Sequence, residues 1–130
     1  MAALLDDVAA FLDAQGVTGG ATGWTVFKSF VPPSPDQVVV VAETGGGEPD
    51  QTEGDKFEEV TFQVRVRGAP MDYAGARAKA RDVYLALNDA SLGADYVFCY
   101  ATQAGPAPLG YDSNDRPELT WNFRALIRRT

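Results

Sequence analysis

The order of hydrophobic and polar residues predicts a helix near the start of the chain. Between residues 3 and 15 the apolar side chains recur every three or four positions, which places them on one face of a helix. These residues are Leu4, Leu5, Val8, Phe11 and Leu12. Gly16 follows, where a glycine commonly ends a helix. The polar face is acidic, so we expect the apolar face to pack on a core and not on an anionic membrane.

Three strands are predicted next. Residues 24–30 are rich in aromatic and β-branched side chains, and prolines then interrupt the pattern. Residues 38–42 are wholly apolar, which is typical of a strand covered on both faces. In residues 57–67 apolar and polar side chains alternate, so one face is apolar while the other carries Arg65 and Arg67.

A polar connection of residues 43–56 separates the second and third predicted strands. It contains three consecutive glycines and is long for a loop between strands. Its acidic residues are Glu43, Glu48, Asp50, Glu53 and Asp55. We expect a mobile loop, and a solvated hairpin tip is the ordinary interpretation of such a segment.

A second helix is predicted after the third strand. Asp72 is placed to cap it, and the helical pattern runs to about Asn88. Its inner stripe is predicted to consist of Tyr73, Ala76, Ala80, Val83, Tyr84 and Leu87. Its water-facing residues are predicted to be Arg77, Lys79, Arg81 and Asp82.

The last part of the chain predicts two more strands around a loop. Residues 95–103 form the first strand, and residues 104–115 are rich in Gly, Pro, Asn and Asp, as in a loop. Residues 118–129 alternate again. One face carries Leu119, Trp121, Phe123, Ala125 and Ile127, and the other carries Thr120, Asn122, Arg124 and Arg128.

These elements predict one α+β domain spanning residues 1–130. Adjacent strands favour a mostly antiparallel sheet of about five strands, with the two helices packed on its apolar face. The arginines of the two alternating strands then lie together on the opposite face. That face is either wet or buried against another subunit.

Charge is unevenly distributed along the chain. There are 18 acidic and 11 basic residues, a net charge of −7, which disfavours a nucleic-acid-binding function. Residues 1–59 contain eleven acids and two bases, a net charge of −9. Residues 60–130 contain seven acids and nine bases, a net charge of +2. Such asymmetry fits self-complementary surfaces, and it also fits two solvated faces of one domain.

The sequence offers no catalytic residue, cofactor site or metal site. It contains no histidine, which removes the Ser–His and Cys–His nucleophile pairs and the usual zinc ligand sets. No glycine cluster has the spacing of a phosphate loop. Residues 112–116 begin like a calcium loop but fail at Arg116 and at the following proline, so we predict a turn. The single cysteine, Cys99, is predicted to be a buried apolar residue.

The loop and last strand carry a family resemblance. Residues 105–112 read Gly-Pro-Ala-Pro-Leu-Gly-Tyr-Asp, and an acidic turn leads to Asp115-Arg116-Pro117-Glu118-Leu119. Trp121-Asn122-Phe123-Arg124 follows. This pattern resembles the C-terminal segment of tail terminator (minor capsid, tail completion) proteins of phages with long, non-contractile tails. The order of the upstream helices and strands agrees with it.

The resemblance implies a non-enzymatic virion protein with an α+β fold. Such proteins form a ring, commonly of six subunits, at the head-proximal end of the tail tube. The ring stops tube polymerisation and joins the head connector. The implied partners are further copies of the chain, the major tail tube protein and the connector. DNA passes through without specific binding, no membrane is involved, and assembly takes place in the host cytoplasm.

Two candidate surfaces follow from these patterns. The acids Glu48, Asp50, Glu53 and Asp55 are expected to approach the basic face of a neighbouring subunit or to line the bore of the ring. That basic face consists of Arg65, Arg67, Arg124 and Arg128. Docking on the tail tube or connector is expected from Pro106, Leu109, Gly110 and Tyr111, unless these side chains are tucked under their own loop.

Two other functions stay open at this point. The first is a head-completion or neck connector protein, which also forms rings but joins the portal side. The second belongs to another class: a small ligand-binding domain or an enzyme that uses carboxylates brought together across the fold.

Overall fold

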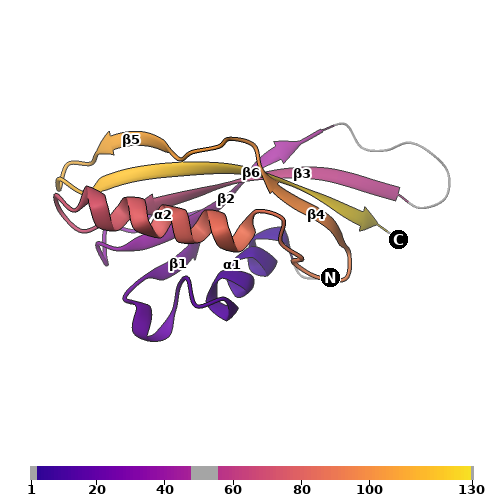
Figure 1. The fold of residues 1–130 in the computed structure, drawn as a ribbon, viewed down its shortest axis with the longest axis horizontal. Helices are drawn as coiled ribbons and strands as arrows, with labels where there is room; N and C mark the ends of the chain where they lie inside the picture. The colour runs from indigo at the N-terminus through magenta and orange to yellow at the C-terminus, as the bar shows by residue number, and fades with distance from the viewer. Residues whose placement is uncertain (1–2, 48–55, 130) are drawn as a thin grey trace.

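The computed structural model describes residues 3–47 and 56–129. The described residues form two α-helices and six strands. Figure 1 shows the strands as one elongated sheet with the helices beside it. The helices are α1 (Leu4–Ala14) and α2 (Tyr73–Leu87), and a 3₁₀ turn spans Gly20–Thr22. The strands are β1 (Thr25–Lys28), β2 (Val38–Gly46), β3 (Lys56–Arg67), β4 (Tyr96–Ala101), β5 (Ala107–Tyr111) and β6 (Pro117–Arg129).

The sheet is mixed and mostly antiparallel. Its order is β1-β2-β3-β6-β4. Strand β5 also pairs with β6, on the same edge as β4 but further toward the start of β6. The long central pair is β3 and β6, in register from Lys56 with Arg129 to Arg67 with Glu118. The predicted α+β class is confirmed, with one strand more than the five expected.

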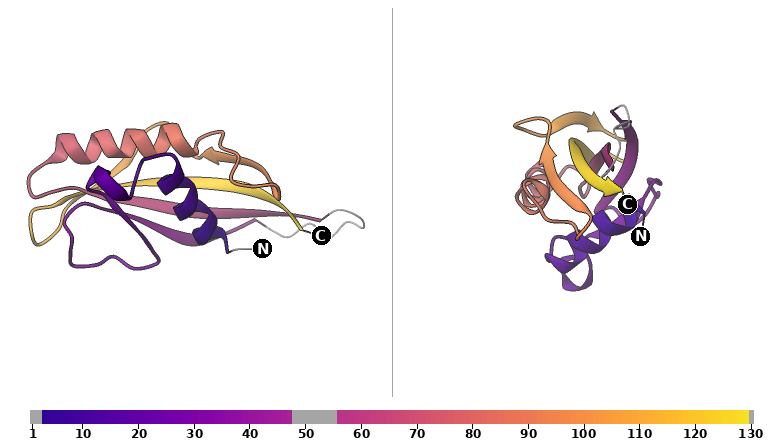
Figure 2. Two further views of the ribbon diagram at one scale, coloured as in Figure 1. Left: turned by 90° about the horizontal axis from the view of Figure 1, so that it is seen from below. Right: turned by 90° about the vertical axis from the view of Figure 1, so that its right-hand side faces the viewer.

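Both helices pack on the same face of the sheet, as predicted (Figure 2). The alternating side chains of β3 and β6 supply the centre of the core. Phe62 stacks on Phe123 with ring centroids 5.3 Å apart, and Trp121 stacks on Tyr84 of α2 at 4.9 Å. Trp121, Phe62 and Phe123 are the largest fully buried side chains of the described residues.

Local signals in the sequence set the helix ends. After α1 the backbone N–H of Val17 donates to the Leu12 carbonyl, and Gly16 adopts a left-handed φ of 74°. This is the glycine-dependent helix ending expected from the sequence. At the start of α2 the Asp72 carboxylate accepts from the Gly75 N–H at 3.0 Å, which confirms the predicted cap.

Strand β2 is longer than predicted. Residues 43–46, expected in the polar connection, continue the strand because β3 extends far enough to pair with them. The hydroxyl of Thr44 donates to that of Thr61 across the two strands at 2.7 Å. Gly45 sits at the register shift with a φ of 97°, a conformation that favours glycine.

Strand β1 pairs with β2 in parallel, which differs from the hairpin-like adjacency expected at this point. The proline-rich residues 29–37 carry the chain back to the starting end of β1 before β2 begins. Ser29 turns the chain with a left-handed φ of 62°, and its N–H donates to the Val41 carbonyl. The long connection is therefore a crossover.

Strand β5 falls inside residues 104–115, which the sequence predicted to be a loop. Two prolines, Pro106 and Pro108, hid it, because proline lacks the N–H that a central strand needs. Within the described part of the chain the strand pairs with β6 alone, so prolines are tolerated on its outer edge. Among the described residues, no helix has the length and apolar character needed to cross a membrane.

Candidate functional site

The four predicted interface arginines do share one face of the sheet. In the antiparallel pair of β3 and β6, Arg65 lies opposite Thr120 and Arg124 lies opposite Thr61. Arg67 and Arg128 occupy positions of the same alternating set. The helices cover the other face, so the predicted arginine-bearing face exists.

Three of these arginines contact partners within their own chain. The guanidinium of Arg65 lies 3.6 Å from the Glu118 carboxylate. That of Arg124 lies 3.9 Å from Glu59, with both side chains well exposed. Arg128 lies over the ring of Phe57 at 5.7 Å. Exposed pairs of this kind contribute roughly 0–1 kcal/mol, so Arg124 and Arg128 stay available for another contact.

Arg67 serves a different purpose from the predicted one. Its side chain is 2% exposed and donates to the carbonyl oxygens of Pro32, Pro35 and Asp36 at 2.6–3.0 Å. Burial lowers the pKa of its guanidinium, and the nearby charge of Arg116 lowers it further. Because its donors are used inside the chain, Arg67 belongs to a clamp on residues 29–37 and not to an exposed basic face.

A second buried arginine completes that clamp. Arg116 is 5% exposed and donates to the Pro33 carbonyl at 2.7 Å and to the Asp36 carboxylate at 3.2 Å. Its Nε also donates to Asp112 at 2.8 Å. No pattern in the sequence predicts these contacts, because the carbonyl partners of the two arginines lie about 30 to 80 residues away along the chain.

The predicted calcium-like sequence is a turn, as expected. Asp112 accepts from the backbone N–H groups of Asn114 and Arg116 at 2.9 Å each. Among the described residues, no group of three or more metal-ligating side chains comes together.

The side chain of Cys99 is fully buried, as predicted. Burial raises the pKa of its thiol to about 12.

The predicted acidic partners Glu48, Asp50, Glu53 and Asp55 lie outside the described residues. Their approach to a neighbouring subunit or to a bore therefore stays a prediction.

The predicted docking segment is exposed. Leu109 and Tyr111 of β5 are each 51% exposed, so the alternative in which they are tucked under their own loop is wrong. Gly110 has a φ of 96° at the register shift between β5 and β6, and Pro106 precedes the strand. These side chains therefore lie on an edge strand of the sheet.

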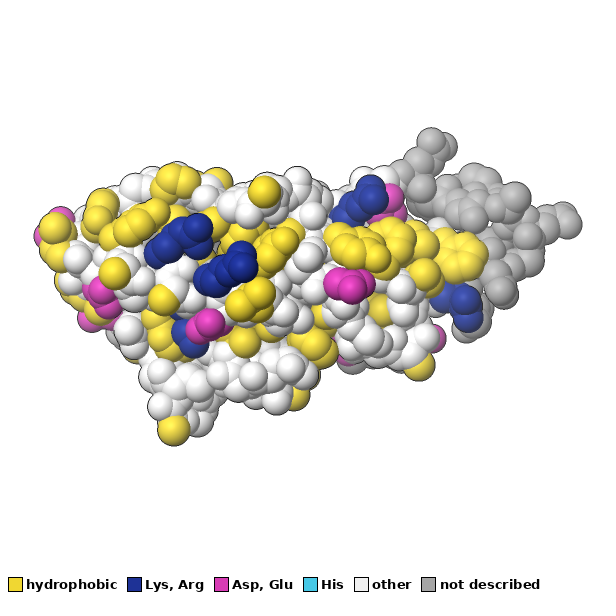
Figure 3. Space-filling view, in the orientation of Figure 1, with side chains coloured by type: hydrophobic (Ala, Val, Ile, Leu, Met, Phe, Trp, Pro, Cys, Tyr) yellow, Lys and Arg dark blue, Asp and Glu magenta, His cyan; other side chains and the backbone are white. Residues whose placement is uncertain are grey.

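Helix α2 presents a basic surface. The sequence analysis predicted only that these residues face water. Figure 3 shows basic side chains over α2 with hydrophobic side chains around them. Lys79 does not belong to this surface. Its ammonium donates to the Val17 carbonyl at 2.9 Å and lies 5.5 Å from the centre of the Trp24 ring. The exposed cations of α2 are Arg77 and Arg81. Tyr73, predicted on the inner stripe, is 43% exposed and lies on this outer side.

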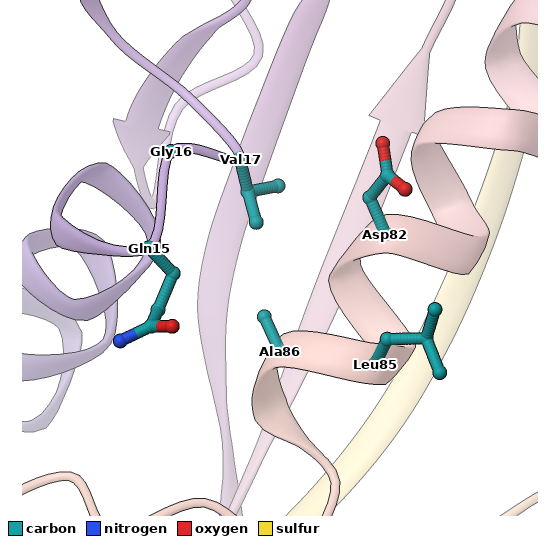
Figure 4. A pocket seen from close by; sticks show the side chains of 6 residues that line it. All are labelled: Gln15, Gly16, Val17, Asp82, Leu85 and Ala86. Carbon is teal, nitrogen blue, oxygen red and sulfur yellow. The ribbon is translucent and has the colours of Figure 1, made fainter.

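An open groove of about 370 Å³ separates the end of α1 from α2 (Figure 4). Its lining includes the side chains of Gln15, Val17 and Leu85, and a single carboxylate, Asp82. That carboxylate lies 3.5 Å from the Lys79 ammonium. A pair of carboxylates flanking a substrate, which the enzyme alternative requires, is not present in this groove.

The comparisons with known proteins identify the family. The family model described as bacteriophage tail terminator protein matches residues 11–129. This chain belongs to the bacteriophage tail terminator protein family. The predicted family resemblance is therefore confirmed, and membership of this family makes the chain a virion structural protein.

A solved structure has a similar fold to this chain. It is a chain from the virion of a native gene transfer agent (GTA) particle, with 21% identity and a TM-score of 0.68. The match covers 98% of this chain and 96% of the other chain. At this identity the likeness shows a shared fold. No curated protein matches the sequence.

Proposed function

We propose that this protein forms a ring on the head-proximal end of the phage tail tube, stops tube polymerisation and provides the surface that joins the head. The observation that carries the proposal is the family match, which extends over residues 11–129. Its partners are further copies of the chain, the major tail tube protein and a head–tail connector. The protein acts without catalysis, and DNA passes through the ring without specific binding.

The distribution of surfaces supports a ring. Subunits in a ring meet head to tail, so each subunit needs two different patches. The sheet ends in β1 on one side and in β4 and β5 on the other, so it offers two unlike edges. The charge asymmetry of the chain fits the same arrangement, because unlike charges then meet at each junction.

Edge strand β5 is the proposed docking surface for the tail tube or the connector. Leu109 and Tyr111 are half-exposed apolar side chains on an edge that has no further strand partner among the described residues. Aromatic and aliphatic anchors that become buried on binding contribute most of the affinity of protein interfaces. The acidic turn that follows β5 is closed by the Asp112 carboxylate, which accepts from the backbone N–H groups of Asn114 and Arg116.

Electron microscopy of particles produced without this chain tests the function. Overlong tail tubes indicate that the protein is a terminator. Tails of normal length beside filled, unjoined heads indicate the neck connector and contradict the proposal. Normal joined particles contradict both.

A double variant, Leu109→Ser with Tyr111→Ser, tests the docking surface. We expect the variant to fold normally, because both side chains are already exposed to water in the free chain. We expect it to fail to cap tails, because the apolar anchors of the docking surface are lost. Val97→Ser is the matched control, since Val97 is 50% exposed on the neighbouring edge strand β4. Normal tails with the double variant contradict this role of β5.

A further inference from the structure

The crossover after β1 presents two exposed apolar side chains. Phe30 is 60% exposed and Val31 is 39% exposed, although the next residue, Pro32, is buried. Ser29 keeps the chain beside β2, because its N–H donates to the Val41 carbonyl at 2.8 Å. Both exposed side chains therefore lie at the β1 edge of the sheet. We call Phe30 and Val31 the β1 anchor.

The β1 anchor is held in a defined conformation. It follows Ser29, whose left-handed φ of 62° is unfavourable for a residue other than glycine. It precedes the carbonyl groups that the buried side chains of Arg67 and Arg116 bind. A side chain that is fixed before binding loses less conformational entropy when it is buried against a partner. Phe30 therefore combines the exposure and the support of an interface anchor.

The opposite edge of the sheet carries an aromatic pair. Phe98 and Tyr100 of β4 lie on the face that the helices leave open, because Cys99 between them points into the core. Their ring centroids are 5.2 Å apart, and the Arg124 guanidinium lies 5.6 Å from the centre of the Phe98 ring. Tyr100 is 40% exposed. We call Phe98, Tyr100 and Arg124 the β4 patch.

The β1 anchor and the β4 patch do not meet within one chain. Strands β1 and β4 are the first and last in the order β1-β2-β3-β6-β4, so four strand spacings, about 19 Å in all, separate them along the sheet. The right-hand view of Figure 2 shows β2 and β4 on opposite sides of β6. The contacts of Ser29, Arg67 and Arg116 fix the anchor at its own edge. A contact between the two surfaces therefore joins one copy to the next.

Charges of opposite sign flank the two surfaces. Residues 3–47, which form α1, β1, the crossover and β2, contain five acids and one base, a net charge of −4. Residues 117–129, which form β6 beside β4, contain one acid and three bases, a net charge of +2. The Arg124 side chain is 49% exposed and its ion pair is long, at 3.9 Å, so it can bind a further carboxylate. These complementary charges fit a contact between the β1 side of one copy and the β4 side of another.

The β4 edge is suited to side-chain contacts and not to pairing with another strand. The Asn88 side chain accepts from the Ala101 N–H at 3.0 Å, and the Asp89 N–H donates to the Cys99 carbonyl at 2.7 Å. These contacts occupy backbone groups on the outer side of β4, which an added strand would need. An approaching copy therefore meets the aromatic side chains of the β4 patch.

We propose that the β1 anchor of one copy packs on the β4 patch of a second copy. The inference rests on the proposed ring, and it names the two patches that meet at each junction. The contact is heterologous, since the two patches differ, and a ring results when its repetition closes. Phe30 packs against the Phe98 and Tyr100 rings, and Arg124 faces the acidic β1 side of the neighbouring copy.

Serine substitutions on the two sides of the contact test the inference. Phe30→Ser and Tyr100→Ser each remove an apolar group that is exposed in the free chain, so we expect normal folding and self-association weakened about tenfold or more. The double variant is expected to associate about as weakly as either single variant, because both changes act on one contact. Leu85→Ser, 62% exposed on α2, is the matched control and leaves association unchanged.

Sedimentation of the purified chain, and of tails that carry it, provides the measurement, and circular dichroism checks that each variant is folded. If the wild type forms rings and both single variants leave them intact, or if the two effects simply add, this inference is wrong while the proposed function stands. If the wild type forms no oligomer alone or on tails, the ring and the inference fail together.

Disulfide trapping gives a second measurement. In a Cys99→Ala background, a chain with Phe30→Cys and Tyr100→Cys is expected to form a ladder of covalent oligomers under mild oxidation. Phe30→Cys with Leu109→Cys is the control, because Leu109 is exposed on the same edge of the sheet but on β5, and this pair is expected to form no ladder. A disulfide that closes within one chain, or a ladder from the control pair alone, contradicts the proposal.

Discussion

The indole nitrogen of Trp121 donates a hydrogen bond of 2.8 Å to the carbonyl oxygen of Ala80. This contact ties the middle of β6, the strand that pairs with three others, to the middle of α2. Tyr84 stacks on the same indole, one turn further along the helix. The position of α2 relative to the sheet therefore depends on a buried tryptophan whose indole N–H has a hydrogen-bond acceptor.

Replacing Trp121 separates its two contributions. Trp121→Phe keeps an aromatic ring but removes the donor, and we expect a loss of about 1–2 kcal/mol in the free energy of unfolding. Trp121→Ala also leaves a cavity, and the expected loss is about 3–5 kcal/mol. Urea denaturation followed by circular dichroism measures both. Val97→Ala, at an exposed position, is the control with an expected change below about 0.5 kcal/mol.

Removing the Arg67 side chain is expected to release the connection of residues 29–37. Arg67→Met keeps the length but leaves three carbonyl oxygens without their charged donor, so we expect a loss of about 3 kcal/mol. Arg67→Lys recovers only part of this, because one ammonium lacks the fork that reaches all three carbonyls. Denaturation gives the stability, and limited proteolysis reports whether cleavage moves into residues 29–37.

The comparison variant for Arg67 is Arg65→Met, two residues earlier on the same strand face. Arg65 is a third exposed and its ion pair with Glu118 is long, at 3.6 Å, so the expected cost is below about 1 kcal/mol. Equal effects of the two substitutions contradict the clamp.

Arg65 and Arg67 show which structural features can be predicted from the sequence and which cannot. Alternation along residues 57–67 correctly placed Arg65 and Arg67 on the face away from the helices, because side-chain direction in a strand is a local property. It did not show that Arg67 is buried. That depends on a crossover more than 30 residues away in sequence, and no periodicity encodes such a contact.

The same distinction explains the errors around β5. Its prolines, with the nearby Gly, Asn and Asp residues, predict a loop, but proline is also compatible with a strand at the edge of a sheet. Pairing of β5 is decided by β6, which is long enough to hold two strands in succession on one edge. The exposure of Leu109 and Tyr111 follows from that pairing and was left open by the sequence.

Cys99 is expected to be inert in the folded protein. Burial raises the pKa of its thiol to about 12, so almost none of the reactive thiolate exists near neutral pH. A thiol reagent at pH 8 is expected to leave the native chain unmodified and to modify one thiol per chain in strong denaturant. Val97→Cys, at an exposed position on the same strand, supplies a fast-reacting control. Rapid labelling of the native wild type contradicts the burial of Cys99.

Asp112 is expected to make the turn after β5 sensitive to acid. Burial raises the pKa of this carboxyl, but hydrogen bonds from the Arg116 and Asn114 backbones and the Arg116 guanidinium outweigh it, so the pKa lies below the ordinary 3.8. When the pKa of a carboxyl is lower in the folded than in the unfolded state, ionisation of that carboxyl stabilises the folded protein. This stabilisation is complete above the unfolded pKa and is lost as the pH falls through the folded pKa. Asp112→Asn is therefore expected to destabilise the protein fully at pH 6 and progressively less as the pH falls below the unfolded value of 3.8. Asp115→Asn in the same turn is the control for urea denaturation, and a pH-independent gap contradicts the role of the charge.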